Sequence, residues 1–341
     1  MRDGGLKFLS GGARLGALEV FVNDVTRRNL IAGASAAAAS ALPAQAAAPE
    51  AGRQAPSVYR YKVGSFEVTA LYDGVWYRPI DEKFVRHADY ADVRREMSDA
   101  FMPEEKLATP FTTVLVNTGK KLILLDTGTG GQIASTAGSF SENLHAAGID
   151  PKTIDQIVIS HFHPDHINGI KTKDNGLIFP NAEILVPEAE WAFWNDDANM
   201  RAAPDGLKIA FHNVRRIFAD IAKDVTHYRP GRQVAPGIET VDAAGHTPGH
   251  TVFALQSGSD SLMVLSDTTQ HPALFARHPD WQPQFDIDGA LAVATRRKLL
   301  DRAAADRMLV TGYHFPFPAC GHIVKTATGY EHVPLLWQTS L

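Results

Sequence analysis

The sequence contains one cysteine, Cys320, among its 341 residues, so it cannot form an internal disulfide. We expect Cys320 to be a buried, unreactive thiol rather than a metal ligand. Basic residues are not in excess, and the net charge of -5 offers no positive field for nucleic acid or anionic lipid. Beyond residue 48 no apolar run is long enough to span a membrane. A Gly-x-Ser-x-Gly nucleophile elbow is also absent, so nothing indicates a covalent serine mechanism.

The N-terminal part of the chain has the pattern of a bacterial twin-arginine export signal. Arg27 and Arg28 precede an uncharged, alanine-rich stretch that ends in Ala44-Gln45-Ala46, a small-residue cleavage pattern. We therefore expect residues 1–46 to be an export signal with an extended n-region and residues 47–341 to be a periplasmic domain. An alanine-rich terminus without a targeting role, or a short membrane anchor, is the alternative.

Strand and helix patterns alternate through the rest of the chain without a repeat or a linker, which predicts a single domain. Alternating or β-branched apolar residues predict strands at 56–73, 112–117, 121–125, 157–159, 183–186, 238–241, 251–255, 262–265 and, as the last strand, 308–311. Helical spacing predicts helices at 86–102, 140–147, 187–194, 207–223 and 289–304.

A dense histidine motif directly follows the predicted strand at 157–159. Because an extended segment alternates its side chains, His161 and His163 can point to the same side. Pro164 then bends the chain and presents Asp165 and His166 from another direction. This arrangement predicts ligands for two neighbouring metal ions, and the alternative is a solvated, histidine-rich surface loop.

Three further candidates each lie at or just beyond the carboxyl end of a predicted strand: His246, Asp267 and His314. Each alone would more often be a structural residue, but together they predict two complete ligand sets. The first ion would be held by His161, His163 and His246, the second by Asp165, His166 and His314, with Asp267 bridging both. Nitrogen and carboxylate ligands without thiolate favour two Zn²⁺ ions, with Mn²⁺, Co²⁺ or Fe²⁺ as substitutes.

The ordered motif His-x-His-x-Asp-His, a later Gly-His, an aspartate and a final histidine resembles the metallo-β-lactamase superfamily. That resemblance implies an α/β fold, an αββα sandwich, with a dinuclear centre at its edge. Asp126, in Asp126-Thr127-Gly128, matches the first motif of the superfamily and should support the ligands from behind. We expect His250 to be hydrogen-bonded near His246. Within the superfamily the chain is most similar to the methyl parathion hydrolase-like branch, in segments 64–71, 115–119, 124–128, 246–251 and 321–334.

The same resemblance implies an aromatic substrate pocket. Trp194 falls at the position of a pocket tryptophan of that branch, and Phe211 lies near a second pocket aromatic. Packing in the core of amphipathic helices is the alternative for both side chains. The branch has a further phenylalanine where this chain has Gly130-Gly131-Gln132-Ile133, which disfavours flat aryl phosphotriesters as the main substrates.

These observations predict an exported dinuclear zinc hydrolase of small carboxylic esters or lactones, with phosphotriesters as further substrates. A metal-bridging hydroxide would attack, and Asp165 or Asp267 would accept its proton. The alternatives are an N-acyl homoserine lactonase, an enzyme whose main activity is organophosphate hydrolysis, and a non-catalytic metal-binding module. We expect no nucleic-acid partner and no membrane association after signal cleavage, and nothing in the sequence indicates an oligomer.

Overall fold

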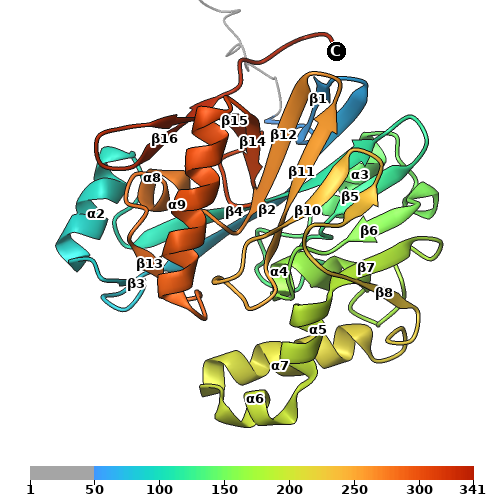
Figure 1. Ribbon diagram of the computed structural model, residues 1–341, viewed down its shortest axis with the longest axis horizontal. Helices are drawn as coiled ribbons and strands as arrows, with labels where there is room; N and C mark the ends of the chain where they lie inside the picture. The colour runs from blue at the N-terminus through green and yellow to red at the C-terminus, as the bar shows by residue number, and fades with distance from the viewer. Residues whose placement is uncertain (1–49) are drawn as a thin grey trace, which may run out of the picture. The chain divides into compact units, whose positions relative to one another are not determined.

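The computed structural model describes residues 50–341, in which two seven-stranded sheets face each other (Figure 1). The expected export signal at residues 1–46 lies outside these described residues. The first sheet runs, in spatial order, β1 (Val58–Val63), β2 (Phe66–Pro79), β4 (Lys106–Asn117), β5 (Leu122–Leu125), β6 (Gln156–Val158), β7 (Glu183–Pro187) and β8 (Val225–Tyr228). The second runs β16 (Tyr330–Pro334), β15 (Cys320–Lys325), β14 (Leu309–Gly312), β12 (Asp260–Ser266), β11 (Thr251–Ser257), β10 (Ile238–Asp242) and β9 (Gln233–Ala235). A small ribbon pairs β3 (Val85–Arg86) with β13 (Gln282–Pro283).

Apolar residues at successive positions of the central strands point to opposite faces, which explains why both faces of each sheet are covered. In β4, Val114 and Val116 belong to the core between the sheets, whereas Leu115 packs on the outer face. Cys320 lies in the core between the sheets and is 1% exposed, and burial raises the pKa of its thiol to about 12. It is therefore the buried, protonated thiol that the sequence predicts.

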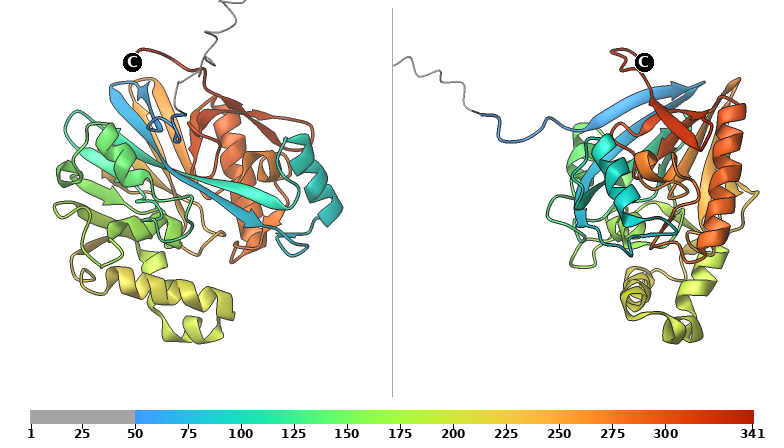
Figure 2. Two further views of the ribbon diagram at one scale, coloured as in Figure 1. Left: turned by 180° about the vertical axis from the view of Figure 1, so that it is seen from behind. Right: turned by 90° about the vertical axis from the view of Figure 1, so that its left-hand side faces the viewer.

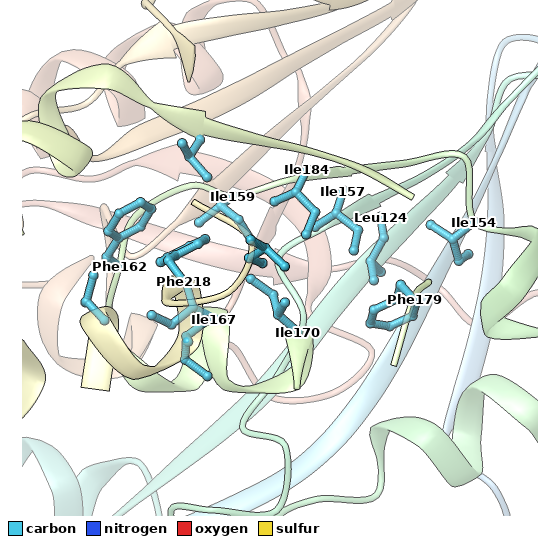
Figure 3. Packing of buried hydrophobic residues seen from close by; sticks show 14 of the residues in the cluster. Leu124, Ile154, Ile157, Ile159, Phe162, Ile167, Ile170, Phe179, Ile184 and Phe218 are labelled. Atoms are coloured by element: carbon cyan, nitrogen blue, oxygen red, sulfur yellow. The ribbon is translucent and has the colours of Figure 1, made fainter. Parts of the chain in front are cut away.

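Helices cover the outer face of each sheet, which confirms the expected αββα sandwich (Figures 1 and 2). On the first sheet lie α3 (Phe140–Ala146), α5 (Glu188–Asn195) and α7 (Asp205–Phe218), with α6 (Asp197–Ala202) between the last two. On the second sheet lie α9 (Gly289–Ala305) and α8 (Pro272–Phe275), and α8 also contacts α2 (Tyr90–Asp99). Figure 3 shows Ile157 of β6 and Ile159 just beyond it with Phe162 and Phe218 in one apolar cluster. Between residues 50 and 341 no helix has both the length and the apolar character needed to cross a membrane.

The structure corrects several predicted boundaries. The predicted strand at 56–73 is a hairpin, because β1 turns at Gly64, which has a φ of 57°, and pairs back onto β2. The predicted last strand at 308–311 is followed by β15 and β16. Both are half-exposed and lack clear apolar alternation, so the sequence pattern did not reveal them. The helices predicted at 86–102 and 207–223 are both shorter in the structure. They correspond to α2, which ends at Asp99, and α7, which ends at Phe218.

Candidate metal centre

Loops that follow strands of both sheets bring the seven predicted ligands together. The side chains form two clusters, in each of which the ligand atoms lie within 4.8 Å of one another. One cluster consists of His161, His163, His246 and Asp267, and the other of Asp165, His166, Asp267 and His314. His161 follows β6, the short helix α4 (Pro164–Ile167) carries Asp165 and His166, and His314 follows β14.

Asp267 belongs to both clusters, and its carboxylate spans the distance between them. Its Oδ1 lies 3.1 Å from Nε2 of His166. Its Oδ2 lies 3.0 Å from Nε2 of His314 and 3.3 Å from Nε2 of His246. Although burial opposes ionisation, His314 and His166 hold the pKa of Asp267 well below its usual value. A buried, ionised carboxylate at this position is suited to bridge two cations.

The donor set fits divalent metal ions. Nδ1 of His163 lies 3.1 Å from Nε2 of His161 and 2.9 Å from Nε2 of His246. Burial, followed by the neighbouring His246, lowers the pKa of His163 to about 3, so this ring is neutral at pH 7, the form that ligates metals. Nε2 of His166 and Oδ1 of Asp267 are buried and have no well-aligned hydrogen bond within residues 50–341. Such a group of close, buried imidazole nitrogen and carboxylate oxygen atoms is typical of a metal centre.

Asp126 lies behind the second cluster, with its carboxylate 2.8 Å from Nδ1 of His166. It also accepts hydrogen bonds from the backbone N–H and the hydroxyl of Ser160, both at 2.7 Å. Because Nδ1 of His166 is held in this way, Nε2 faces Asp267 and Asp165. Carboxylates in this position orient a ligand imidazole and raise its basicity.

Asp286 performs the same function for the first cluster, and the sequence analysis missed it. Its Oδ1 lies 2.9 Å from Nδ1 of His246, and its Oδ2 accepts a hydrogen bond from Arg296 at 3.2 Å. Arg296 is itself fully buried and also donates to the carbonyl oxygen of Thr268 at 2.8 Å. Burial alone would lower the pKa of His246, but hydrogen bonds to Asp267 and Asp286 raise it to about 9. Asp286 does not belong to a sequence motif. The only sequence signal for it was its possible ion-pair partner Arg296, which lies within the helix predicted at 289–304.

His250 lies outside both clusters and positions Asp267, the residue that the clusters share. Its Nδ1 donates to the carbonyl oxygen of Ala243 at 3.0 Å, so its Nε2 is free to accept the backbone N–H of Asp267 at 3.2 Å. Burial, together with His246, lowers the pKa of His250 to about 3, which keeps the ring in this neutral form.

Glu190, which the sequence analysis also missed, joins two ligand loops through a buried carboxylate. It accepts backbone hydrogen bonds from Phe162 at 2.9 Å and from Gly249 at 2.7 Å. It also accepts the indole N–H of Trp194 at 2.7 Å. The loop of His161 and His163 is thereby tied to the loop of His246. The signal for Glu190 was weak, because an acidic residue in the first turn of a helix is usually a solvated one.

The clusters open into a cavity of about 450 Å³. His163, Asp165, His246, Asp267 and His314 line its floor. Its walls are mostly apolar and include the side chains Trp76, Phe111, Ile133, Leu207, Ile209, Ala210 and Phe285, with Gln132, Asn168, Asn213 and Gln270 as polar groups.

Trp194 and Phe211 do not line this cavity, contrary to the expected aromatic pocket. Both side chains are fully buried, and their ring centroids lie 4.7 Å apart in the core beneath α5 and α7. Phe211 packs against Phe193 and Trp194 of α5, while Leu207 and Ala210, on an adjacent face of α7, reach the cavity. The structure therefore supports the core-packing alternative for these two residues.

Comparison with known proteins agrees with this geometry. The family description "Metallo-beta-lactamase superfamily" matches residues 110–312. The chain belongs to the metallo-β-lactamase superfamily. The N-acyl homoserine lactonase AttM of Azorhizobium caulinodans is 31% identical over 198 residues, which cover 54% of this chain and 66% of the relative.

Two solved structures of superfamily members are similar over most of this chain. The dizinc quorum-quenching lactonase AidC, solved with a product bound, is 30% identical with a TM-score of 0.78, covering 83% of this chain and 99% of its own. The hydrolase AbOPH is 28% identical with a TM-score of 0.79, covering 84% of this chain and 100% of its own. Superfamily membership is thus confirmed, and the narrower methyl parathion hydrolase-like branch stays a prediction.

Proposed function

We propose that this protein is a dinuclear metal hydrolase, with zinc as its first candidate metal, that opens lactones and cleaves small carboxylic esters. The observation that supports the proposal most strongly is the pair of ligand clusters that share Asp267 on the floor of a largely apolar cavity. The similarity to lactonases, one of them described as dizinc, favours lactones within the ester class.

Two bound divalent ions would supply Lewis acidity and lower the pKa of water toward neutrality. His161, His163 and His246 would hold one ion, and Asp165, His166 and His314 the other, with Asp267 between them. The chain's own contribution is to fix these groups and to keep bulk water out of the apolar cavity. A scissile carbonyl on the floor of the cavity would lie against both clusters.

Asp165 is the better candidate to accept a proton during turnover. Its side chain is 15% exposed toward the cavity, whereas that of Asp267 is 3% exposed. Its position is fixed from behind, because the hydroxyl of Tyr313 donates to the backbone carbonyl of Asp165 at 2.5 Å. Asp267 would then have the bridging role alone.

Phosphotriester hydrolysis is the second candidate. The chain has no aromatic residue in the segment 130–133, but Trp76, Phe111 and Phe285 line the cavity and can contact an aryl group. The missing phenylalanine therefore does not exclude such substrates, and our preference for lactones rests on the relatives.

The proposal is tested on one zinc-loaded preparation by comparing kcat/KM for a small lactone, an aryl acetate and an aryl phosphotriester. We expect the lactone or the acetate to lead, close to two ions per chain, loss of activity on chelation, and recovery with zinc, cobalt or manganese. A clear lead for the phosphotriester would make organophosphate hydrolysis the main activity. Full activity at one ion per chain would contradict the dinuclear centre.

We further propose that residues 1–46 export the folded protein to the periplasm.

A further inference from the structure

One wall of the cavity is formed by a single face of two paired strands. β2 and β4 run antiparallel, with Trp76 opposite Thr109 and Arg78 opposite Leu107. Because side chains alternate along a strand, Trp76, Arg78 and Thr109 lie on the same face, and all three line the cavity. This wall carries the only arginine or lysine among the described residues that line the cavity.

Arg78 is buried there without an acceptor. It is 7% exposed, its Nε is fully buried, and its guanidinium makes no hydrogen bond or ion pair with any residue between 50 and 341. Its close neighbours are aromatic rings, with Phe285 at 4.0 Å and Phe84 at 4.8 Å from the guanidinium carbon. Cation–π contact offsets part of the cost of burying the charge, but it leaves the N–H donors unpaired.

A second buried arginine shows what a structural role looks like in this fold. Arg296 donates to the carbonyl oxygens of Thr268, Pro279 and Trp281, each at 2.8 Å, and pairs with Asp286. Arg78 has no such partners, although the two side chains are similarly buried. The donors of Arg78 are therefore available to a ligand in the cavity.

Thr109 adds a second unpaired polar group to the same wall. Its Oγ1 is buried and has no hydrogen-bond partner within residues 50–341. The acidic side chains that line the cavity are Asp165 and Asp267, and both belong to the metal clusters. Burial lowers the pKa of Arg78 to about 10, with Asp165 opposing the shift, so the guanidinium stays charged at neutral pH. The cavity thus holds a permanently charged guanidinium that has no hydrogen-bond acceptor among residues 50–341.

We propose that Arg78, assisted by Thr109, binds a carboxylate of the substrate that is remote from the scissile bond. This inference rests on the proposed function and narrows its substrate class to lactones and esters that carry a carboxylate. A planar guanidinium recognises a carboxylate through charge-assisted hydrogen bonds, and apolar surroundings strengthen that interaction. The apolar side chains of the cavity would contact the chain between the carboxylate and the scissile carbonyl.

The test uses matched pairs that differ only in a terminal carboxylate. The zinc-loaded protein is assayed with 4-nitrophenyl hemiglutarate and 4-nitrophenyl pentanoate, and calorimetry measures the binding of glutarate and pentanoate. We expect KM for the hemiglutarate to be about 10- to 100-fold lower than for the pentanoate, the range of a charge-assisted hydrogen bond. Arg78→Met should remove this preference by raising KM for the hemiglutarate much more than KM for the pentanoate. Arg78→Lys should retain part of the preference, and Thr109→Val should reduce it less.

The outcomes separate the two proposals. Equal KM values for both esters in the wild-type protein would overturn the carboxylate site. An equal rise in KM for both esters in Arg78→Met would also overturn it. If neither ester is hydrolysed, the proposed function fails, and the carboxylate site then depends on calorimetry alone. It stands if glutarate binds more tightly than pentanoate only when Arg78 is present, and it is overturned if the two bind equally. Should Arg78→Met fail to fold, the wild-type comparison and Arg78→Lys decide the question.

Discussion

Replacing Asp286 with asparagine should weaken the binding of one metal ion and leave the other in place. Asp286 contacts His246, a ligand of the first cluster, and touches no ligand of the second. Asparagine has nearly the same shape but no charge, so it can still contact Nδ1 of His246 while no longer increasing the basicity of the ring. The matched control is Asp126→Asn, because Asp126 contacts His166 in the second cluster at nearly the same distance, 2.8 Å against 2.9 Å.

The expected magnitude follows from the position of the carboxylate behind the ligand. Removing such a partner typically costs about 10- to 100-fold in metal affinity, which corresponds to about 1.4 to 2.7 kcal/mol. The substitution also weakens the ion pair with Arg296, which is fully buried. Because Arg296 keeps its three backbone carbonyl acceptors, we expect a folded protein with a reduced free energy of unfolding.

Competition with a chromogenic chelator resolves the two binding steps in the wild-type protein and in both variants. Asp286→Asn should weaken the metal affinity of one binding step and Asp126→Asn that of the other. Urea unfolding of the metal-free proteins should separate changes in metal affinity from changes in stability. If both variants shift the same step, or if Asp286→Asn shifts neither, the assignment of one supporting carboxylate to each cluster is wrong.

Three further predictions concern the shared carboxylate of Asp267, the packing of Trp194 and the proposed export signal. Asp267→Ala should leave the fold intact but reduce kcat by about 10²-fold or more, because both clusters lose their shared carboxylate; near wild-type kcat with two ions bound would contradict its bridging role. Trp194→Phe removes the hydrogen bond to Glu190 and should lower the free energy of unfolding by about 1 to 2 kcal/mol without changing KM for aryl esters. A raised KM would instead indicate that Trp194 contacts the substrate. Lysine at both Arg27 and Arg28 should trap precursor in the cytoplasm, as followed by cell fractionation, and unchanged periplasmic delivery would refute twin-arginine routing.

Much of the fold could be predicted because its strands are buried on both faces. β5 and β6 consist almost entirely of aliphatic residues, since one face packs between the sheets and the other under helices. β15 and its neighbour β16, the edge strand of the second sheet, escaped prediction for the opposite reason. Half of their side chains face solvent, so their sequences lack the apolar pattern that marks a strand.

The clustering of the candidate ligands could be predicted because a metal centre needs specific side chains at short spacing, and four of the candidates occur within six residues, from His161 to His166. The supporting groups were partly hidden. Asp126 belongs to a motif, but Asp286 and Glu190 are single acidic residues whose partners become apparent only when distant loops meet. Their burial, rather than their sequence context, identifies them.

The cavity walls show why a substrate is harder to predict than a metal centre. The strand pattern places Arg78 on one face of β2, and an arginine there would ordinarily extend into solvent. It is buried because Phe285, which lies more than two hundred residues further along the chain, covers its guanidinium. In the proposed carboxylate site, substrate selection would depend on contacts between segments that the ligand motif does not include. A relative with all seven ligands but an apolar side chain in place of Arg78 should bind the same metals and prefer the neutral member of each ester pair.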